Sequence, residues 1–168
     1  MRAELWIPGP TEVREDILAA MAEPMIGHRS AEMRELIHAL DPHLEALFGA
    51  SAPSHRVAVH SCTATGLMEM ALRATGRRVL CLVNGAFSKR FATIAEALGK
   101  EVVRIESAAG DRPDLAAARQ RLSNEAFDAV TVCLSETSTG VAVSPAEISL
   151  ALGERGSAML LVDAVTYL

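Results

Sequence analysis

The side chains best suited to chemistry in this sequence stand directly after short apolar runs. The first group is Ser61-Cys62-Thr63-Ala64-Thr65, which lies between an apolar run and a stretch with helical spacing of apolar residues. The first turn of a helix offers unpaired backbone N–H groups and the positive end of the helix dipole, to which these hydroxyls add further donors. The group is therefore typical either of a phosphate site or of a threonine that merely caps a helix, and by itself it favours neither.

Three further positions of this kind carry an aromatic ring, a hydroxyl and a carboxylate. Phe87 lies in a glycine-containing loop where its ring could stack on a planar ligand, although a loop phenylalanine more often fills a core. The Thr137 hydroxyl could donate to an oxyanion or could simply satisfy a turn. Asp163 follows a strongly apolar run, where a partly desolvated carboxylate needs a cation or a donor to stay ionised, unless it caps the next element.

Each of these groups suits one part of pyridoxal phosphate. The turn before the helix could hold the phosphate, and the aromatic ring could cover the face of the pyridine. A hydroxyl could bond the 3-oxygen, and the carboxylate could pair with the ring nitrogen. We therefore predict a site for this cofactor, formed by the turn at Ser61–Thr65 together with Phe87, Thr137 and Asp163.

Residues 56–168 have a pattern that would position these groups along one edge of a sheet. Short apolar runs of strand length occur at Val57–Val59, Val79–Val83, Val102–Ile105, Ala129–Leu134 and Met159–Val162. Helix-like stretches lie between them, near residues 65–74, 87–98, 114–122 and 145–152. The alternation predicts a three-layer α/β/α domain with a mostly parallel sheet, in which ligands bind beyond the carboxyl ends of the strands.

Residues 1–55 are expected to form a separate N-terminal arm with helices. After a segment rich in proline and glycine, Thr11 is placed as the N-cap of a first helix. Ser30 is placed as the N-cap of a second helix, which kinks or restarts at Asp41 and the proline after it, and which ends at Gly49.

The composition limits the classes of protein that are plausible. With 168 residues, half of them apolar, the chain can form one ordinary domain or a piece of a larger one. A net charge of −5 without a basic stripe argues against nucleic acid as a partner. No signal peptide and no membrane-spanning run is recognised, so we expect a cytoplasmic protein without a membrane partner. Cys62, Cys81 and Cys133 suggest neither a disulfide framework nor a metal site.

The chain resembles, almost end to end, the class V aminotransferases of the fold type I pyridoxal-phosphate enzymes, in the serine–pyruvate and alanine–glyoxylate branch. Five ordered segments at compatible spacings carry the resemblance: Pro8-Gly9-Pro10-Thr11, Pro24–Ser30, Val83–Phe87, Glu136–Val141 and Leu160–Val165. Such an order of segments is far more specific than any one segment. The resemblance implies the fold of the pyridoxal-phosphate-dependent transferases, with residues 56–168 as the first part of an incomplete large domain.

The resemblance also implies a role for individual residues. The cofactor-binding positions are Thr63, Ala64 and Thr65 at the phosphate, Phe87 on the ring, Thr137 at the 3-oxygen and Asp163 at the pyridinium nitrogen, and Gly9 lies close to the bound substrate. Asp163 is the catalytic position among them. The chain departs from the family at Cys62 and Ala64, where glycine is frequent, so we expect the backbone to approach the phosphate differently in detail.

The activity implied is the transfer of an amino group from alanine or serine to a 2-oxo acid such as glyoxylate or pyruvate, in a homodimer. In the family, the Schiff-base lysine follows the aspartate by some tens of residues, and an arginine that binds the substrate carboxylate comes later still. The lysines here are Lys89 and Lys100, and neither matches that position. We therefore expect the N-terminal portion of an aminotransferase, inactive by itself.

Other functions remain open from the sequence. A phosphonate transaminase or a desulfurase-like lyase would share the fold and the cofactor. A non-catalytic fragment or a scaffold that depends on a partner chain would explain the missing lysine. A dinucleotide-dependent oxidoreductase is disfavoured, because no G-x-G-x-x-G motif follows a predicted strand.

Overall fold

The computed structural model describes residues 4–50, 55–153 and 156–167. The chain divides into two compact units, Met1–His60 and Ser61–Leu168. Within the described ranges, no helix combines the length and the hydropathy that crossing a membrane requires.

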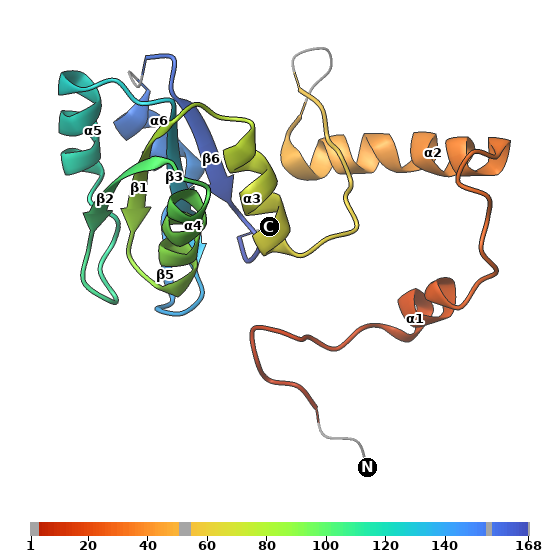
Figure 1. Cartoon of the computed structure of the whole chain (residues 1–168). Helices are drawn as coiled ribbons and strands as arrows, with labels where there is room; N and C mark the ends of the chain where they lie inside the picture. Colours follow the sequence, from red (N-terminus) through yellow and green to blue (C-terminus); the bar gives the residue numbers. More distant parts are fainter. Residues whose placement is uncertain (1–3, 51–54, 154–155, 168) are drawn as a thin grey trace. The chain divides into compact units, whose positions relative to one another are not determined.

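The first unit contains two helices, α1 (Glu15–Met21) and α2 (Ala31–Phe48) (Figure 1). The predicted cap at Ser30 is confirmed, because its hydroxyl accepts a hydrogen bond from the Met33 N–H at 3.1 Å. The predicted end of α2 is also confirmed, since Gly49 adopts the left-handed conformation, with φ of 59°, that terminates helices.

Two predictions for this unit are wrong. Thr11 does not cap α1, which begins only at Glu15, after Arg14 at the N-cap. The acidic Glu15 and Asp16 favour a helix start there, because they lie at the positive end of the helix dipole. Nor does α2 restart at Asp41, since one continuous helix carries Pro42 in its interior, whereas the alternative of a kink at this point stays a prediction. Proline has a helical φ angle, and its cost can be offset when the apolar pattern continues on both sides.

The second unit is built on a four-stranded parallel sheet. Its strands are β1 (Arg78–Val83), β2 (Glu101–Glu106), β3 (Ala129–Cys133) and β6 (Met159–Asp163), in the order β2-β1-β3-β6. Every neighbouring pair is parallel. Four of the five predicted strands are thus confirmed, and the two central ones, β1 and β3, are buried almost throughout, as expected for apolar strands between two helical layers.

Four helices cover the sheet, two on each face (Figure 1). On one face, α3 (Ala64–Arg73) and α4 (Ala86–Ala97) pack against the odd-numbered residues of β1, among them Cys81. On the other face, α5 (Leu115–Asn124) and α6 (Pro145–Leu152) pack against even-numbered residues such as Leu80. This alternation of side chains along β1 confirms the three-layer α/β/α architecture.

The strand predicted at Val57–Val59 is absent from the described structure. Residues 55–60 have no regular secondary structure, and Val59 is 75% exposed. Three apolar residues between Arg56 and His60 form a run too short to specify a strand, and the described part of the first unit contains no sheet with which they could pair.

The strand order reverses direction between β1 and β3. The chain passes from β1 to β2 on one side, and then returns to place β3 and β6 on the other side. In open α/β sheets, ligands bind at such a switch point, outside the carboxyl ends of the strands. The segments after β1, β3 and β6 are therefore where a site is expected.

Candidate functional site

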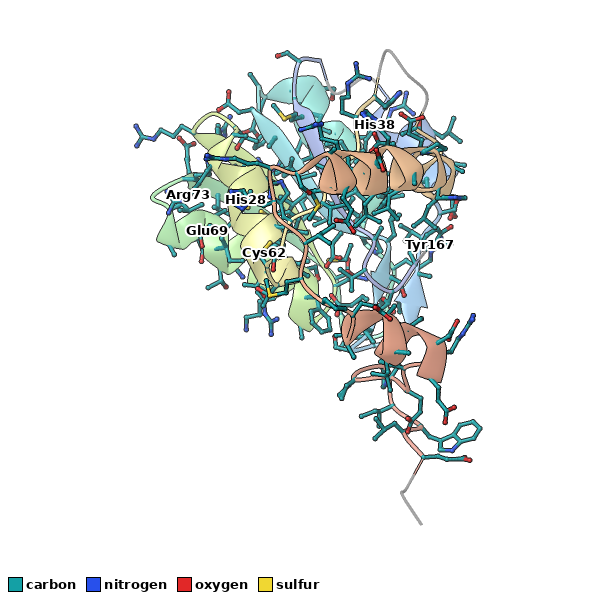
Figure 2. The ribbon with its side chains drawn as sticks, turned by 90° about the vertical axis from the view of Figure 1, so that its right-hand side faces the viewer. His28, His38, Cys62, Glu69, Arg73 and Tyr167 are labelled. Carbon is teal, nitrogen blue, oxygen red and sulfur yellow. The ribbon has the colours of Figure 1, made fainter. Side chains whose placement is uncertain are left out.

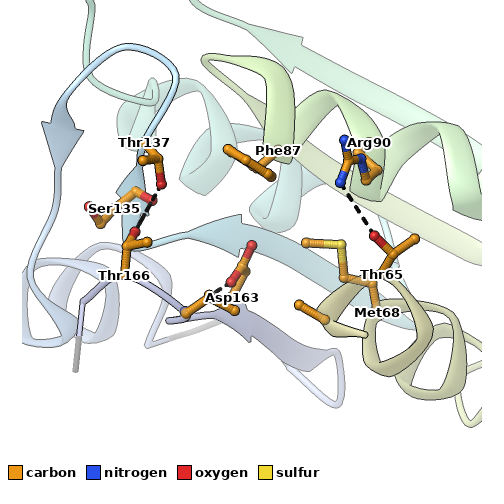
Figure 3. A pocket seen from close by; sticks show the side chains of 10 residues that line it. Thr65, Met68, Phe87, Arg90, Ser135, Thr137, Asp163 and Thr166 are labelled. Carbon is orange, nitrogen blue, oxygen red and sulfur yellow. Dashed lines mark hydrogen bonds between the residues drawn. The ribbon is translucent and has the colours of Figure 1, made fainter. Parts of the chain in front are cut away.

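A pocket of about 80 Å³ lies at this edge of the sheet, between the starts of α3 and α4 and the segments that follow β3 and β6 (Figure 3). Its wall is formed by Ala64, Thr65, Met68, Phe87, Arg90, Ser135, Thr137, Asp163, Val165 and Thr166. Five of the seven residues proposed from the sequence, from four separate segments, thus meet in one cavity. Thr63 does not line it, and Gly9 belongs to the first unit.

The start of α3 separates the roles of its two threonines. Thr63 is the N-cap, and its hydroxyl accepts a hydrogen bond from the Gly66 N–H at 3.1 Å. For this residue the capping interpretation is confirmed. The hydroxyl of Thr65 instead accepts a hydrogen bond from the guanidinium of Arg90 at 3.3 Å, beside the pocket (Figure 3). The first N–H groups of α3 have no intrahelical acceptor, so this corner of the pocket presents donors.

The outer surface of α3 is ordinary. Glu69 and Arg73 lie one turn apart and form an ion pair at 2.8 Å (Figure 2). Cys62, just before the helix, is exposed, whereas Cys81 and Cys133 are buried, and all three are free. The residues of α3 that line the pocket are Ala64, Thr65 and Met68.

Phe87 is placed by a buried carboxylate that the sequence analysis did not single out. Glu136 is 0% exposed, and its carboxylate accepts hydrogen bonds from the Phe87 N–H at 3.2 Å and the Ser88 N–H at 2.9 Å. It also accepts from the hydroxyls of Ser88 at 2.9 Å and Ser138 at 2.6 Å. A carboxylate is favoured here because the first turn of α4 presents unpaired N–H groups.

The charge of Glu136 is stabilised in place. Burial raises the pKa of this carboxyl, but hydrogen bonds from Ser138, Ser88 and Phe87 outweigh burial and hold its pKa below the ordinary value. Glu136 lies in β4 (Ser135–Glu136), which pairs antiparallel with β5 (Val141–Ala142). The carboxylate therefore ties this small hairpin, which also carries Thr137, to the start of α4.

Thr137 and Thr166 point toward each other on the same side of the pocket, with their hydroxyl oxygens 3.0 Å apart (Figure 3). The Thr166 hydroxyl also donates to the carbonyl oxygen of Ser135 at 3.2 Å. Because a hydroxyl has one proton, the shared hydrogen bond is donated by Thr137 when Thr166 donates to Ser135. A ligand oxygen that accepts a hydrogen bond from the Thr137 hydroxyl would take the place of the Thr166 hydroxyl.

Asp163 is the last residue of β6, and its carboxylate lies against the pocket. One oxygen accepts a hydrogen bond from the Val165 N–H at 3.1 Å, and the other accepts from the Cys133 thiol at 3.5 Å. Burial, with the Asp163 carboxylate nearby, raises the pKa of Cys133, so this thiol stays protonated and can donate. Among the described residues Asp163 has no cationic partner. The pocket thus offers a half-buried carboxylate that a cationic ligand group would complement.

Five residues of the pocket wall were not predicted from the sequence: Met68, Arg90, Ser135, Val165 and Thr166. Helical spacing could have found two of them. Arg90 comes three residues after Phe87 on α4, and Met68 comes three residues after Thr65 on α3, so each pair shares a helix face.

The two lysines do not line the pocket. Lys100 donates through its ammonium group to the carbonyl oxygens of Thr75 at 3.0 Å and Gly76 at 2.8 Å, which directly precede β1. It therefore sits at the amino end of that strand, away from the carboxyl edge. Lys89 is exposed and is not part of the pocket wall.

Comparisons with known proteins find relatives that match nearly the whole chain, although no family model matches it. The chain is 34% identical over 170 residues to the soluble hydrogenase 42 kDa subunit of Anabaena cylindrica. It is 30% identical over 172 residues to the serine–glyoxylate aminotransferase of Methylorubrum extorquens. Both alignments cover 98% of this chain, but only 44% and 42% of the respective relatives. The chain thus spans less than half the length of the curated relatives it matches.

A solved structure shares the fold of this chain over nearly its whole length. The subgroup IV aspartate aminotransferase from Thermus thermophilus superimposes with a TM-score of 0.79 and 28% sequence identity. The superposition covers 96% of this chain and 46% of that chain. The arrangement of strands and helices described above is therefore shared with a part of a larger chain.

Proposed function

The chain matches the N-terminal part of the class V aminotransferases in sequence and in fold. On that basis, we propose that its pocket binds pyridoxal 5′-phosphate for amino transfer. One observation carries the proposal. Thr65, Phe87, Thr137 and Asp163 come from four separate segments, and they line a single pocket at the switch point of the sheet. Their chemistry complements the cofactor part by part.

The polar groups of the pocket fit the cofactor at both of its ends. The first turn of α3 and the Thr65 hydroxyl would receive the phosphate, because this corner offers N–H and hydroxyl donors at a helix N-terminus. The carboxylate of Asp163, which has no cationic partner among the described residues, would receive the protonated ring nitrogen. Phe87, fixed through Glu136, would cover the ring and exclude water from it.

The reaction divides between the cofactor and the protein. Bound pyridoxal phosphate supplies a conjugated ring that withdraws electrons from the bonds at the substrate α-carbon. Asp163 holds a proton on the ring nitrogen, which strengthens that withdrawal. The Val165 N–H and the Cys133 thiol hold the carboxylate in place. The amine that binds the cofactor covalently is expected from elsewhere in the natural polypeptide, because Lys89 and Lys100 lie outside the pocket wall.

We propose a small amino acid such as serine or alanine as the amino donor, and glyoxylate or pyruvate as the acceptor. The name of the Methylorubrum relative, serine–glyoxylate aminotransferase, supports serine as the donor and glyoxylate as the acceptor. In the whole natural polypeptide loaded with the cofactor, we expect glyoxylate-dependent conversion of serine or alanine, followed as glycine formation. The Thr65→Leu variant should need more cofactor to reach the same rate, because it loses a phosphate donor. Absence of amino transfer with every donor and acceptor tried would refute the proposal.

We also propose a homodimer as the working form. The described part of the first unit supports it, since no residue of α1 or α2 is buried. The exposed large apolar side chains of α2 are Leu36, Ile37, Leu40, Leu47 and Phe48. Such a contiguous apolar stripe is typical of a surface that a partner covers. Light scattering of the whole natural polypeptide should give twice the monomer mass, and a monomer at micromolar concentration would contradict this.

A further inference from the structure

Arg90 is a charged residue of the pocket wall, and the proposed function assigns no role to it. It lies on α4 one turn beyond Phe87, and its guanidinium carbon is 5.2 Å from the centre of the Phe87 ring. Its Nη1 donates to the Thr65 hydroxyl at 3.3 Å (Figure 3). Arg90 thus connects the residue expected to cover the ring with the residue expected to contact the phosphate.

The charge of Arg90 is not matched by an acid among the described residues, whereas five other arginines of the second unit form ion pairs. Ion pairs with carboxylates at 2.9 Å or less are made by Arg73, Arg78, Arg104, Arg112 and Arg121. Among the described residues no carboxylate lies within ion-pair distance of Arg90. A guanidinium that lines a pocket beside a hydroxyl and a helix N-terminus forms a strong site for an anion.

Resting on the proposed function, we infer that Arg90 binds the phosphate of the cofactor together with the Thr65 hydroxyl and the first turn of α3. The guanidinium carries five donors, of which one is used by Thr65, so others remain for phosphate oxygens. Its contact with the Phe87 ring holds the side chain over the pocket wall. Arg90 is in this view a binding residue, and Phe87 orients it.

The test compares two ligands that differ only in the phosphate. Pyridoxamine 5′-phosphate and pyridoxamine share the ring, and neither carries the aldehyde that would react with lysines at random. Binding of each is measured by calorimetry on the whole natural polypeptide, in the unsubstituted form and in two variants. Arg90→Gln removes the guanidinium, and Lys89→Gln removes the same charge from the neighbouring exposed residue outside the pocket wall.

Arg90→Gln should weaken pyridoxamine 5′-phosphate at least tenfold and leave pyridoxamine within twofold, while Lys89→Gln changes neither. Equal affinity of the Arg90→Gln variant for the phosphorylated ligand would overturn the inference. An equal loss for both ligands would also overturn it, because Arg90 would then act only through the Phe87 ring.

The outcome for the unsubstituted protein separates this inference from the proposed function. If it binds neither ligand, the proposed cofactor site fails, and the role of Arg90 fails with it. If it binds both ligands with the same affinity, the cofactor site stands, but no residue, Arg90 included, binds the phosphate. Circular dichroism of the Arg90→Gln variant should match the parent, since Arg90 is exposed outside the hydrophobic core.

Discussion

Gly85→Ala is expected to destabilise the second unit by about 3 kcal/mol, through overpacking and the loss of buried hydrogen bonds. A Cβ at this position would lie 2.3 Å from Cγ and 2.4 Å from Cδ of Glu136, and 2.7 Å from the Ser138 hydroxyl oxygen. The backbone itself is not strained, because φ at Gly85 is 175°. The clash arises because Glu136 is fully buried, and moving it breaks its hydrogen bonds to Phe87 and Ser88.

Thermal or urea unfolding of the variant measures this effect, and Gly66→Ala is a matched control. A Cβ at Gly66 would meet its nearest neighbour, Cys62 Cβ, at 3.5 Å, an ordinary contact. Because Gly66 lies inside α3, its replacement by alanine should stabilise the second unit by up to about 1 kcal/mol. The same substitution should thus act in opposite directions at the two sites. A Gly85→Ala protein as stable as its parent would show that Glu136 does not fill this space.

Asp163→Asn is expected to lower the rate of amino transfer about 100-fold, as loss of a preorganised charge does at other active sites. The amide has the shape of the carboxylate and can still accept from the Val165 N–H, so the pocket should keep its form. It carries no negative charge, however, and would no longer hold a proton on the ring nitrogen. Turnover should therefore fall far more than cofactor affinity.

Steady-state kinetics and cofactor titration of the whole natural polypeptide separate these two effects. Asp114→Asn is the control, because Asp114 caps α5 by accepting from the Ala117 N–H at 2.8 Å, and asparagine caps equally well. That variant should keep the parent's turnover. If Asp163→Asn also kept it, the role given to Asp163 would be wrong.

The sheet and its helices could be predicted because local pattern determines them. The runs at β1, β3 and β6 are too apolar for any place but a sheet covered on both faces, and the stretches between them have helical periodicity. The prediction failed where the local signal was short or ambiguous. Val57–Val59 has three apolar residues and no partner in its unit, and Pro42 is tolerated inside α2.

The candidate site could be predicted in part for a similar reason. Thr65, Phe87 and Asp163 stand where parallel strands end or helices begin, and topology alone brings such positions together. Their roles toward a cofactor stay predictions. Glu136 could not be recognised, because its importance arises from contacts with Phe87 and Ser88, 49 and 48 residues away in sequence. Nothing in the neighbouring sequence indicates that this glutamate is buried.

We propose that one pocket at the carboxyl edge of the sheet binds pyridoxal phosphate through Thr65, Phe87 and Asp163. A crystal structure of the whole natural polypeptide with the cofactor bound tests it most directly. We expect the phosphate at Thr65 and the first turn of α3, the ring against Phe87, and the ring nitrogen within hydrogen-bond distance of Asp163. A cofactor bound elsewhere, or with its ring nitrogen directed away from Asp163, would contradict it.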